Sequence, residues 1–141
     1  MFEKIVTDEL KRSGLKSLLV VGKPDTPFHI QKGRLEIVNH LTSDKLQTAI
    51  RDAGVVICRS GYSSVMDLIA MGKKAIFVPT PQQPEQVFLA DYLKEQVVAF
   101  SMDQKKFSVK EGMKTVDQFK GLSYYEYDNA LLLKAIDSIV A

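Results

Sequence analysis

The 141-residue sequence contains one cysteine, two histidines and no tryptophan, and these scarcities exclude several kinds of protein. Cys58 cannot form an intrachain disulfide, and its place at the end of an apolar run predicts a reduced, buried, structural thiol. Neither His29 nor His40 lies beside a suitable set of cysteines or carboxylates. We therefore expect no metal site in this protein.

Long apolar runs and an excess of one charge are also missing. No run approaches the roughly 20 residues that a membrane helix needs. No signal peptide precedes the first predicted helix, so we expect a cytoplasmic protein, with peripheral contact at the inner face of the membrane left open. The net charge is +2, and Lys and Arg are spread along the sequence, which argues against nucleic acid as a partner.

The chain does contain a regular alternation of short apolar runs and amphipathic segments. Runs such as 55–58 have the aliphatic composition of buried parallel strands. This alternation predicts an α/β, Rossmann-like parallel sheet with helices on both faces, and we expect 55–58 near its centre. The expected strands are 18–22, 35–39, 55–58, 75–78 and 97–100, and the expected helices are 2–12, one from Ser43 or Asp44, one after Gly61, and 84–95, 109–119 and 129–140.

The beginning of the sequence departs from this fold. The sequence opens inside a helix, whereas a doubly wound domain opens with a strand and a phosphate-binding turn. We therefore expect that the first strand is missing, and that residues 1–141 are a single domain from a longer chain.

The turn at Ser60-Gly61 has the most distinctive chemistry. Ligands of parallel sheets bind beyond the carboxyl ends of the strands, where the unpaired N–H groups of a helix start suit an anionic ligand. Asp67 follows Ser63 by four residues and shares its helix face, so its carboxylate could accept hydrogen bonds from a diol. An anion site beside such a carboxylate predicts a pocket for a sugar nucleotide.

Residues 41–93 carry a series of short motifs in a fixed order. The motifs are Val-Val-Ile-Cys-Arg-Ser-Gly at 55–61, Asp67, Ala-Met-Gly at 70–72, Ala-Ile-Phe-Val-Pro at 75–79, and Glu85-Gln86. Together they resemble the C-terminal half of GT-B glycosyltransferases of the family 28 type, the family of the lipid-II-forming N-acetylglucosaminyltransferase. The sequence departs from that family at Gly54 (Asp in the family), Asp67 (usually Glu) and Leu89-Ala90 (Asn-Ala), and it lacks the glycine-rich phosphate loop.

The resemblance implies a UDP-sugar donor, transfer of a hexosyl group to an acceptor hydroxyl, and no cofactor. N-acetylglucosaminyl is among the candidate groups. By position, Asp67 would hold the ribose hydroxyls, Gln86 would contact the donor sugar, and Arg59 would be either a phosphate ligand or a structural partner of carbonyls or ions. The remaining implied donor-binding residues are Thr42 and Ser43 at the uracil, Ser60, Gly61 and Tyr62 at the nucleotide-sugar, and Ser63 and Ser64 near its phosphates.

Three hypotheses follow for the whole protein. In the first, an N-terminal acceptor-binding domain supplies the general base, so this chain binds the donor without turnover. The others are half of a UDP-sugar 2-epimerase, or a non-catalytic donor-binding subunit of a split glycosyltransferase. Structural alternatives also stay open for single residues: Asp67 as a solvated carboxylate, Ser60 as a helix cap, and Tyr124, Tyr125 and Tyr127 as packing rather than base-stacking residues.

Overall fold

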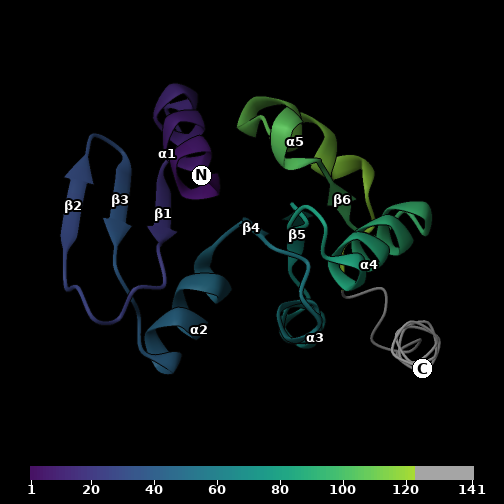
Figure 1. The fold of residues 1–141 in the computed structure, drawn as a ribbon, viewed down its shortest axis with the longest axis horizontal. Helices are drawn as coiled ribbons and strands as arrows, with labels where there is room; N and C mark the ends of the chain where they lie inside the picture. The colour runs from purple at the N-terminus through teal and green to yellow at the C-terminus, as the bar shows by residue number, and fades with distance from the viewer. Residues whose placement is uncertain (123–141) are drawn as a thin grey trace. The chain divides into compact units, whose positions relative to one another are not determined.

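The computed structural model describes residues 1–122, which form two compact units (Figure 1). Unit 1 contains Met1–Asp52 with Ser108–Lys110, and unit 2 contains Ala53–Phe107 with the described residues from 111 onward. The tyrosine cluster Tyr124, Tyr125 and Tyr127 and the helix expected at 129–140 lie outside the described residues. That the sequence is one domain of a longer chain stays a prediction.

Unit 1 combines two helices with a small sheet. α1 (Phe2–Ser13) ends before Gly14, as the sequence predicts, and buries Val6 and Leu10. β1 (Ser17–Val20) and β3 (Leu35–Val38) pair in parallel, because each carries the short aliphatic run expected of such strands. α2 (Ser43–Asp52) follows β3 and has no buried residue.

β2 (His29–Lys32) is a strand that the sequence pattern does not predict. It pairs antiparallel with β3 through a turn at Gly33, whose φ of 60° is a left-handed conformation that suits glycine. All four residues of β2 are exposed, so no apolar alternation marks the strand. The sheet of unit 1 has the order β1-β3-β2 and is therefore mixed, which corrects the expectation of an entirely parallel sheet.

Unit 2 has the predicted parallel α/β arrangement. β4 (Val55–Cys58), β5 (Lys74–Phe77) and β6 (Phe100–Ser101) form a parallel sheet, with α3 (Tyr62–Met71) and α4 (Pro84–Glu95) as the connections. η1 (Gln104–Lys106), α5 (Val109–Thr115) and η2 (Val116–Gln118) follow β6. The α/β class, with parallel strands and crossover helices, is thus confirmed.

Helical segments cover both faces of the sheet in unit 2. The buried side of α3 consists of Val65, Leu68 and Ile69, as predicted, and α4 buries Leu89, Ala90 and Leu93. On the other face, Ile76 of β5 packs with Phe100 and Val116, and Met113 and Phe119 surround them. Ile76 and its neighbours in β5 alternate between the two faces, which is why one strand supplies both layers of the core.

The position of β4 differs from the prediction. The strand order is β4-β5-β6, so β5 occupies the centre of this sheet and β4 lies at an edge. All four residues of β4 are half-buried, whereas Ala75, Ile76 and Phe77 of β5 are fully buried. The prediction that 55–58 lies near the centre is therefore wrong for this sheet.

The last predicted strand is displaced along the chain. β6 begins at Phe100, because the chain turns at Val97, which has a φ of 58° and is 45% exposed. The Val97 N–H donates to the Lys94 carbonyl and the Val98 N–H donates to the Leu93 carbonyl, each at 3.0 Å. The apolar run 97–100 is thus partly a turn that follows α4.

Candidate functional site

The predicted donor-binding residues are divided between the two units. Thr42 and Ser43 belong to unit 1, where both are exposed after the carboxyl end of β3. The Thr42 carbonyl accepts the Leu46 N–H at 2.8 Å, so α2 begins at Ser43. The other predicted residues lie in unit 2, and most follow the carboxyl end of β4: Arg59, Ser60, Gly61, Tyr62, Ser63, Ser64 and Asp67, with Gln86 on α4.

Arg59 connects three segments of unit 2. Its Nη1 donates to the carbonyls of Val78 at 3.1 Å and Pro79 at 3.2 Å, and its Nη2 donates to Gln104 Oε1 at 2.7 Å. Partial burial lowers the pKa of the guanidinium, but an arginine with three acceptors stays charged near neutral pH. Arg59 is thus a partner of carbonyls that holds together the segments after β4, β5 and β6, and its contact with a phosphate stays a prediction.

Ser60 and Gln86 join the turn before α3 to the start of α4. Ser60 is completely buried, and its Oγ donates to the Gln86 carbonyl at 2.7 Å. Gln86 Oε1 in turn accepts the Thr80 N–H at 2.8 Å. Ser60 is thus a positioning residue rather than a helix cap, since the N-cap of α3 is Gly61 and no side chain caps that helix.

The N-terminal end of α3 is open above Gly61. Gly61 has an ordinary extended conformation, with φ −67° and ψ 152°, and a Cβ placed on it would meet no atom within 4 Å. The Gly61 carbonyl accepts the Val65 N–H at 3.0 Å, while the first N–H groups of any α-helix have no partner within the helix. This end of α3 therefore offers hydrogen-bond donors and room for an approaching ligand.

The polar side chains of α3 lie on its exposed side. Tyr62, Ser63, Ser64 and Asp67 are all exposed, whereas Val65 is fully buried. Within residues 1–122, Asp67 makes no ion pair. The carboxylate and the two serine hydroxyls are therefore accessible to solvent and to a ligand at the start of α3.

Two residues of this network were missed from the sequence. Gln104 lies 45 residues beyond Arg59, and the motifs that carry the family resemblance end near residue 93. Thr80 contributes a backbone N–H, which every residue except proline possesses. Neither contact could be predicted from the motifs, because Gln104 lies outside them and the Thr80 contact does not depend on the type of side chain.

Cys58 precedes Arg59 at the end of β4 and has no disulfide partner. Burial raises the pKa of its thiol to about 12. A thiol with such a pKa is almost entirely protonated at neutral pH and is a poor nucleophile. This agrees with the predicted structural role of Cys58.

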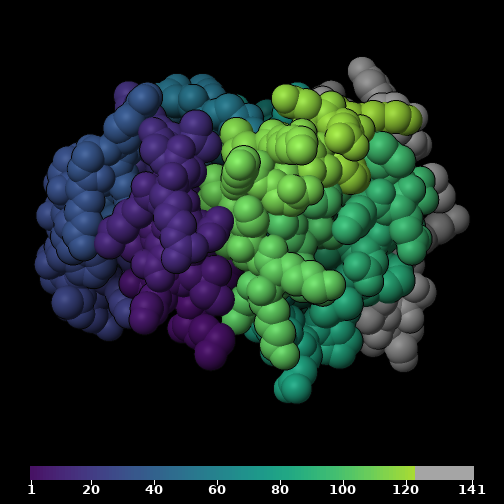
Figure 2. Space-filling view, turned by 90° about the horizontal axis from the view of Figure 1, so that it is seen from above, coloured from purple at the N-terminus to yellow at the C-terminus, as the bar shows by residue number. Residues whose placement is uncertain are grey.

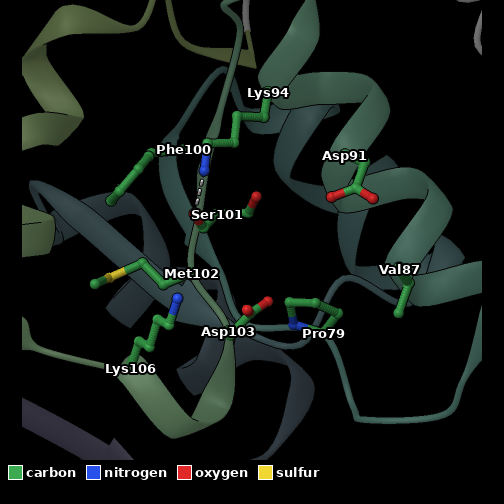
Figure 3. A pocket seen from close by; sticks show the side chains of 9 residues that line it. All are labelled: Pro79, Val87, Asp91, Lys94, Phe100, Ser101, Met102, Asp103 and Lys106. Carbon is green, nitrogen blue, oxygen red and sulfur yellow. Dashed lines mark hydrogen bonds between the residues drawn. The ribbon is translucent and has the colours of Figure 1, made fainter.

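A pocket of about 340 Å³ lies along β6 (Figure 3). Asp91 and Lys94 of α4 line it together with Ser101, and Lys94 Nζ donates to the Ser101 carbonyl at 3.3 Å. Lys94 Nζ also lies 5.1 Å from the centroid of the Phe100 ring. None of the ten predicted donor-binding residues lines this pocket, so it is distinct from the turn before α3.

Residues 1–122 hold no group of three or more His, Cys, Asp or Glu side chains suited to a metal ion. Among the helices of those residues, none has the length and apolar character to cross a membrane. The expected lack of a metal site stays a prediction.

The sequence matches a known family over nearly its whole length. Residues 3–137 match the glycosyltransferase family 28 C-terminal domain. The chain belongs to this family. The resemblance noted from the motifs at 41–93 is thereby confirmed, and family 28 members are relatives of the whole chain rather than of one segment.

Two relatives of this family 28 domain have the same name. A protein of Glaesserella parasuis serovar 5 (strain SH0165) is 36% identical over 75 residues, 52% of this chain and 21% of that protein. One of Histophilus somni (strain 129Pt) is 36% identical over 87 residues, 59% and 24% respectively. Both are named UDP-N-acetylglucosamine--N-acetylmuramyl-(pentapeptide) pyrophosphoryl-undecaprenol N-acetylglucosamine transferase. The matched part is thus less than a quarter of either relative.

A solved structure supports the fold. The NMR solution structure of ALG13 superposes with a TM-score of 0.54 at 20% sequence identity. The superposition covers 86% of this chain and 63% of ALG13. The two proteins therefore share the α/β fold of this family 28 domain.

Proposed function

We propose that this chain is the donor-binding domain of a glycosyltransferase that moves a hexosyl group from a UDP-sugar to an acceptor hydroxyl. The curated relatives use UDP-N-acetylglucosamine by name, which makes N-acetylglucosaminyl the first candidate group. The observation that carries the proposal is the open start of α3. There Gly61, Ser63, Ser64 and Asp67 are accessible, while Arg59 and Ser60 beneath them are bonded to the framework.

In this proposal, different residues contact the diphosphate, the ribose and the sugar of the ligand. The unpaired N–H groups at the start of α3 stabilise the charge of the departing diphosphate, with Ser63 and Ser64 beside it. The Asp67 carboxylate accepts hydrogen bonds from the ribose hydroxyls. Gln86 donates from its amide nitrogen to the sugar, because its amide oxygen is occupied by the Thr80 N–H.

The general base and the acceptor site belong, in this proposal, to an N-terminal domain of a longer chain. No cofactor and no metal are needed, because the helix start supplies the electrostatic stabilisation. The protein would act in the cytoplasm, in peripheral contact with the inner face of the membrane. The 141-residue chain alone should bind UDP weakly, since it lacks the glycine-rich loop, and it should not turn over UDP-sugars.

Calorimetric titration with UDP tests the proposed site with two matched variants. Asp67→Asn removes the charge of a charge-assisted contact and should weaken UDP binding roughly tenfold, with thermal melting unchanged. Asp91→Asn is the control, because Asp91 is also an exposed aspartate of unit 2 but lines the pocket along β6. It should leave UDP affinity unchanged.

The two variants also distinguish the alternatives. If only Asp91→Asn lost affinity for UDP, the nucleotide would bind in the pocket along β6 and not at the start of α3. Unchanged affinity in a folded Asp67→Asn variant would make Asp67 a solvated helix carboxylate. Multiple turnovers of a UDP-sugar by the purified chain would overturn the assignment of the general base to another domain.

A further inference from the structure

Unit 1 gathers basic residues from three segments at one end of its sheet. The C-terminal end of α1, the start of β1 and the β2–β3 turn lie at the same end (Figure 1). The Ser17 N–H donates to the Arg34 carbonyl at 3.0 Å, which sets Lys16 beside Arg34. Figure 2 is seen from this side, and the purple surface of α1 adjoins the blue surface of the hairpin. We call Lys11, Leu15, Lys16, Lys32 and Arg34 the basic tip.

The cations of the basic tip are close together. The Lys11 ammonium lies close enough to Lys32 that it lowers the pKa of the Lys32 side chain. Two positive charges held this close disfavour the charged form of each side chain, and a bound anion relieves that repulsion. The arrangement is therefore favourable for a negatively charged partner.

Carboxylates of unit 1 do not neutralise this cluster. Among the described residues, no ion pair involves Lys11, Lys16, Lys32 or Arg34. Glu9 pairs with Arg12 at 3.3 Å, and Glu36 Oε1 lies 2.9 Å from His29 Nε2, a contact that is an ion pair only when the imidazole is protonated. Asp8, one turn before Lys11, is the remaining carboxylate on this half of α1. The C-terminal end of α1 itself favours Lys11, but Lys16, Lys32 and Arg34 have no such helix end beside them.

Leu15 lies in the loop between α1 and β1, directly before Lys16. Its N–H donates to Ser13 Oγ at 3.2 Å and its carbonyl accepts from Ser17 Oγ at 3.0 Å, so two hydroxyls hold its backbone. The Leu15 side chain is 42% exposed. A single exposed leucine is ordinary, but here two hydroxyls hold the backbone of the loop and a lysine follows the leucine directly.

We propose that the basic tip docks unit 1 on an anionic phospholipid surface, with the cations on the phosphates and Leu15 in the headgroup layer. Basic residues near such a surface and a nearby apolar side chain act together in peripheral binding. The basic tip contains no aromatic side chain on which a nucleic acid base could stack. The inference rests on the membrane contact named in the proposed function and assigns it a surface, while binding to vesicles and binding of UDP are measured separately.

The position of the basic tip sets the orientation of unit 1. It lies at the amino ends of β1 and β3, whereas Thr42 and Ser43 follow the carboxyl end of β3. Membrane contact through the basic tip therefore leaves the predicted uracil-binding end of unit 1 open.

Co-sedimentation of the purified chain with vesicles tests the interface. We compare vesicles of phosphatidylcholine alone with vesicles that also contain phosphatidylglycerol, at low and high salt. Each basic residue contributes roughly fivefold in affinity, so the double variant Lys32→Glu, Arg34→Glu should bind anionic vesicles at least about 25-fold more weakly. The matched control Lys45→Glu, Lys114→Glu alters two exposed basic residues elsewhere and changes the net charge of +2 equally.

A Leu15→Ser variant separates the apolar contribution from the charge. It should weaken vesicle binding roughly tenfold, with the same salt dependence as the unchanged protein. Equal binding to both kinds of vesicle, or equal loss in the control variant, would overturn the proposal. So would binding to single-stranded RNA without binding to anionic vesicles. Circular dichroism melting of each variant establishes that it is folded.

Discussion

The two sides of the turn before α3 carry similar polar residues but use them differently. On the inner side, Arg59 and Ser60 donate hydrogen bonds to backbone carbonyls, those of Val78, Pro79 and Gln86. On the outer side, Ser63, Ser64 and Asp67 are exposed. One short motif therefore contains both the framework and the proposed contact surface.

The residues of one family motif therefore have different roles. The inner side positions the start of α3 against the loops after β5 and β6, and its substitution should affect unfolding. Within residues 1–122, Ser63, Ser64 and Asp67 on the outer side make no such bonds to the loops after β5 and β6, so their substitution should affect binding alone.

Arg59→Ala should have the largest effect on stability. It removes three hydrogen bonds from a charged donor and leaves the Val78 and Pro79 carbonyls without that partner. We expect a loss of about 2–3 kcal/mol in the free energy of unfolding, measured by urea denaturation. Arg59→Lys, which keeps the charge but not the fork of donors, should recover part of the loss. Full stability of Arg59→Ala would contradict the framework role.

Ser60→Ala should cost less. It deletes one buried hydroxyl and leaves the Gln86 carbonyl without its donor, which is worth about 1–2 kcal/mol. Ser64→Ala is the control in the same helix turn, and it should leave the free energy of unfolding unchanged because Ser64 is exposed. Equal costs for the two variants would remove the distinction between inner and outer sides.

Cys58 lies beside Arg59 at the end of β4, and the partial burial of its thiol makes stability depend on pH. The pKa is raised from 9.0 to about 12 in the folded chain, so the unfolded chain loses its proton first as the pH rises. The contribution of the protonated Cys58 thiol to the free energy of unfolding is fully present below pH 9. Between pH 9 and pH 12 this contribution falls by up to about 1.4 kcal/mol per pH unit.

The measurement compares urea unfolding of the protein and of Cys58→Ala at several pH values. The difference between them should change above pH 9 and be constant below it. Rapid alkylation of Cys58 by iodoacetamide at neutral pH without denaturant would show that the thiol is accessible, contrary to this account.

Much of the fold follows from local sequence. The aliphatic runs of β1, β3, β4 and β5 were located to within one residue or two, and Pro84 correctly marks the start of α4. β2 was missed because its residues are polar and exposed, and its pairing depends on β3. The edge position of β4 was also missed, because apolar composition reports burial and not the order of strands in a sheet.

The candidate site was predictable by residue but not by role. The motif locates Arg59, Ser60 and Asp67, yet the partners of Arg59 are 19 to 45 residues away along the chain. The basic tip shows the same limit, since Lys16 and Arg34 are 18 residues apart in the sequence and become neighbours through the pairing of β1 with β3. Contacts of this kind depend on the fold and have no local signal.

Gly61→Ala should have the smallest effect on stability and the clearest effect on binding. The backbone of Gly61 is extended, with φ −67°, so alanine adopts it without strain, and the added Cβ meets no atom within 4 Å. Loss of a favourable N-cap residue should cost at most about 1 kcal/mol.

The methyl group of Gly61→Ala would occupy the open space above the N-terminal end of α3, where we place the diphosphate. UDP affinity measured by calorimetry should therefore fall while the unfolding midpoint changes little. If UDP bound equally well to Gly61→Ala, the nucleotide would not lie against this end of α3, and the accessible residues of the outer side would be ordinary solvated polar groups.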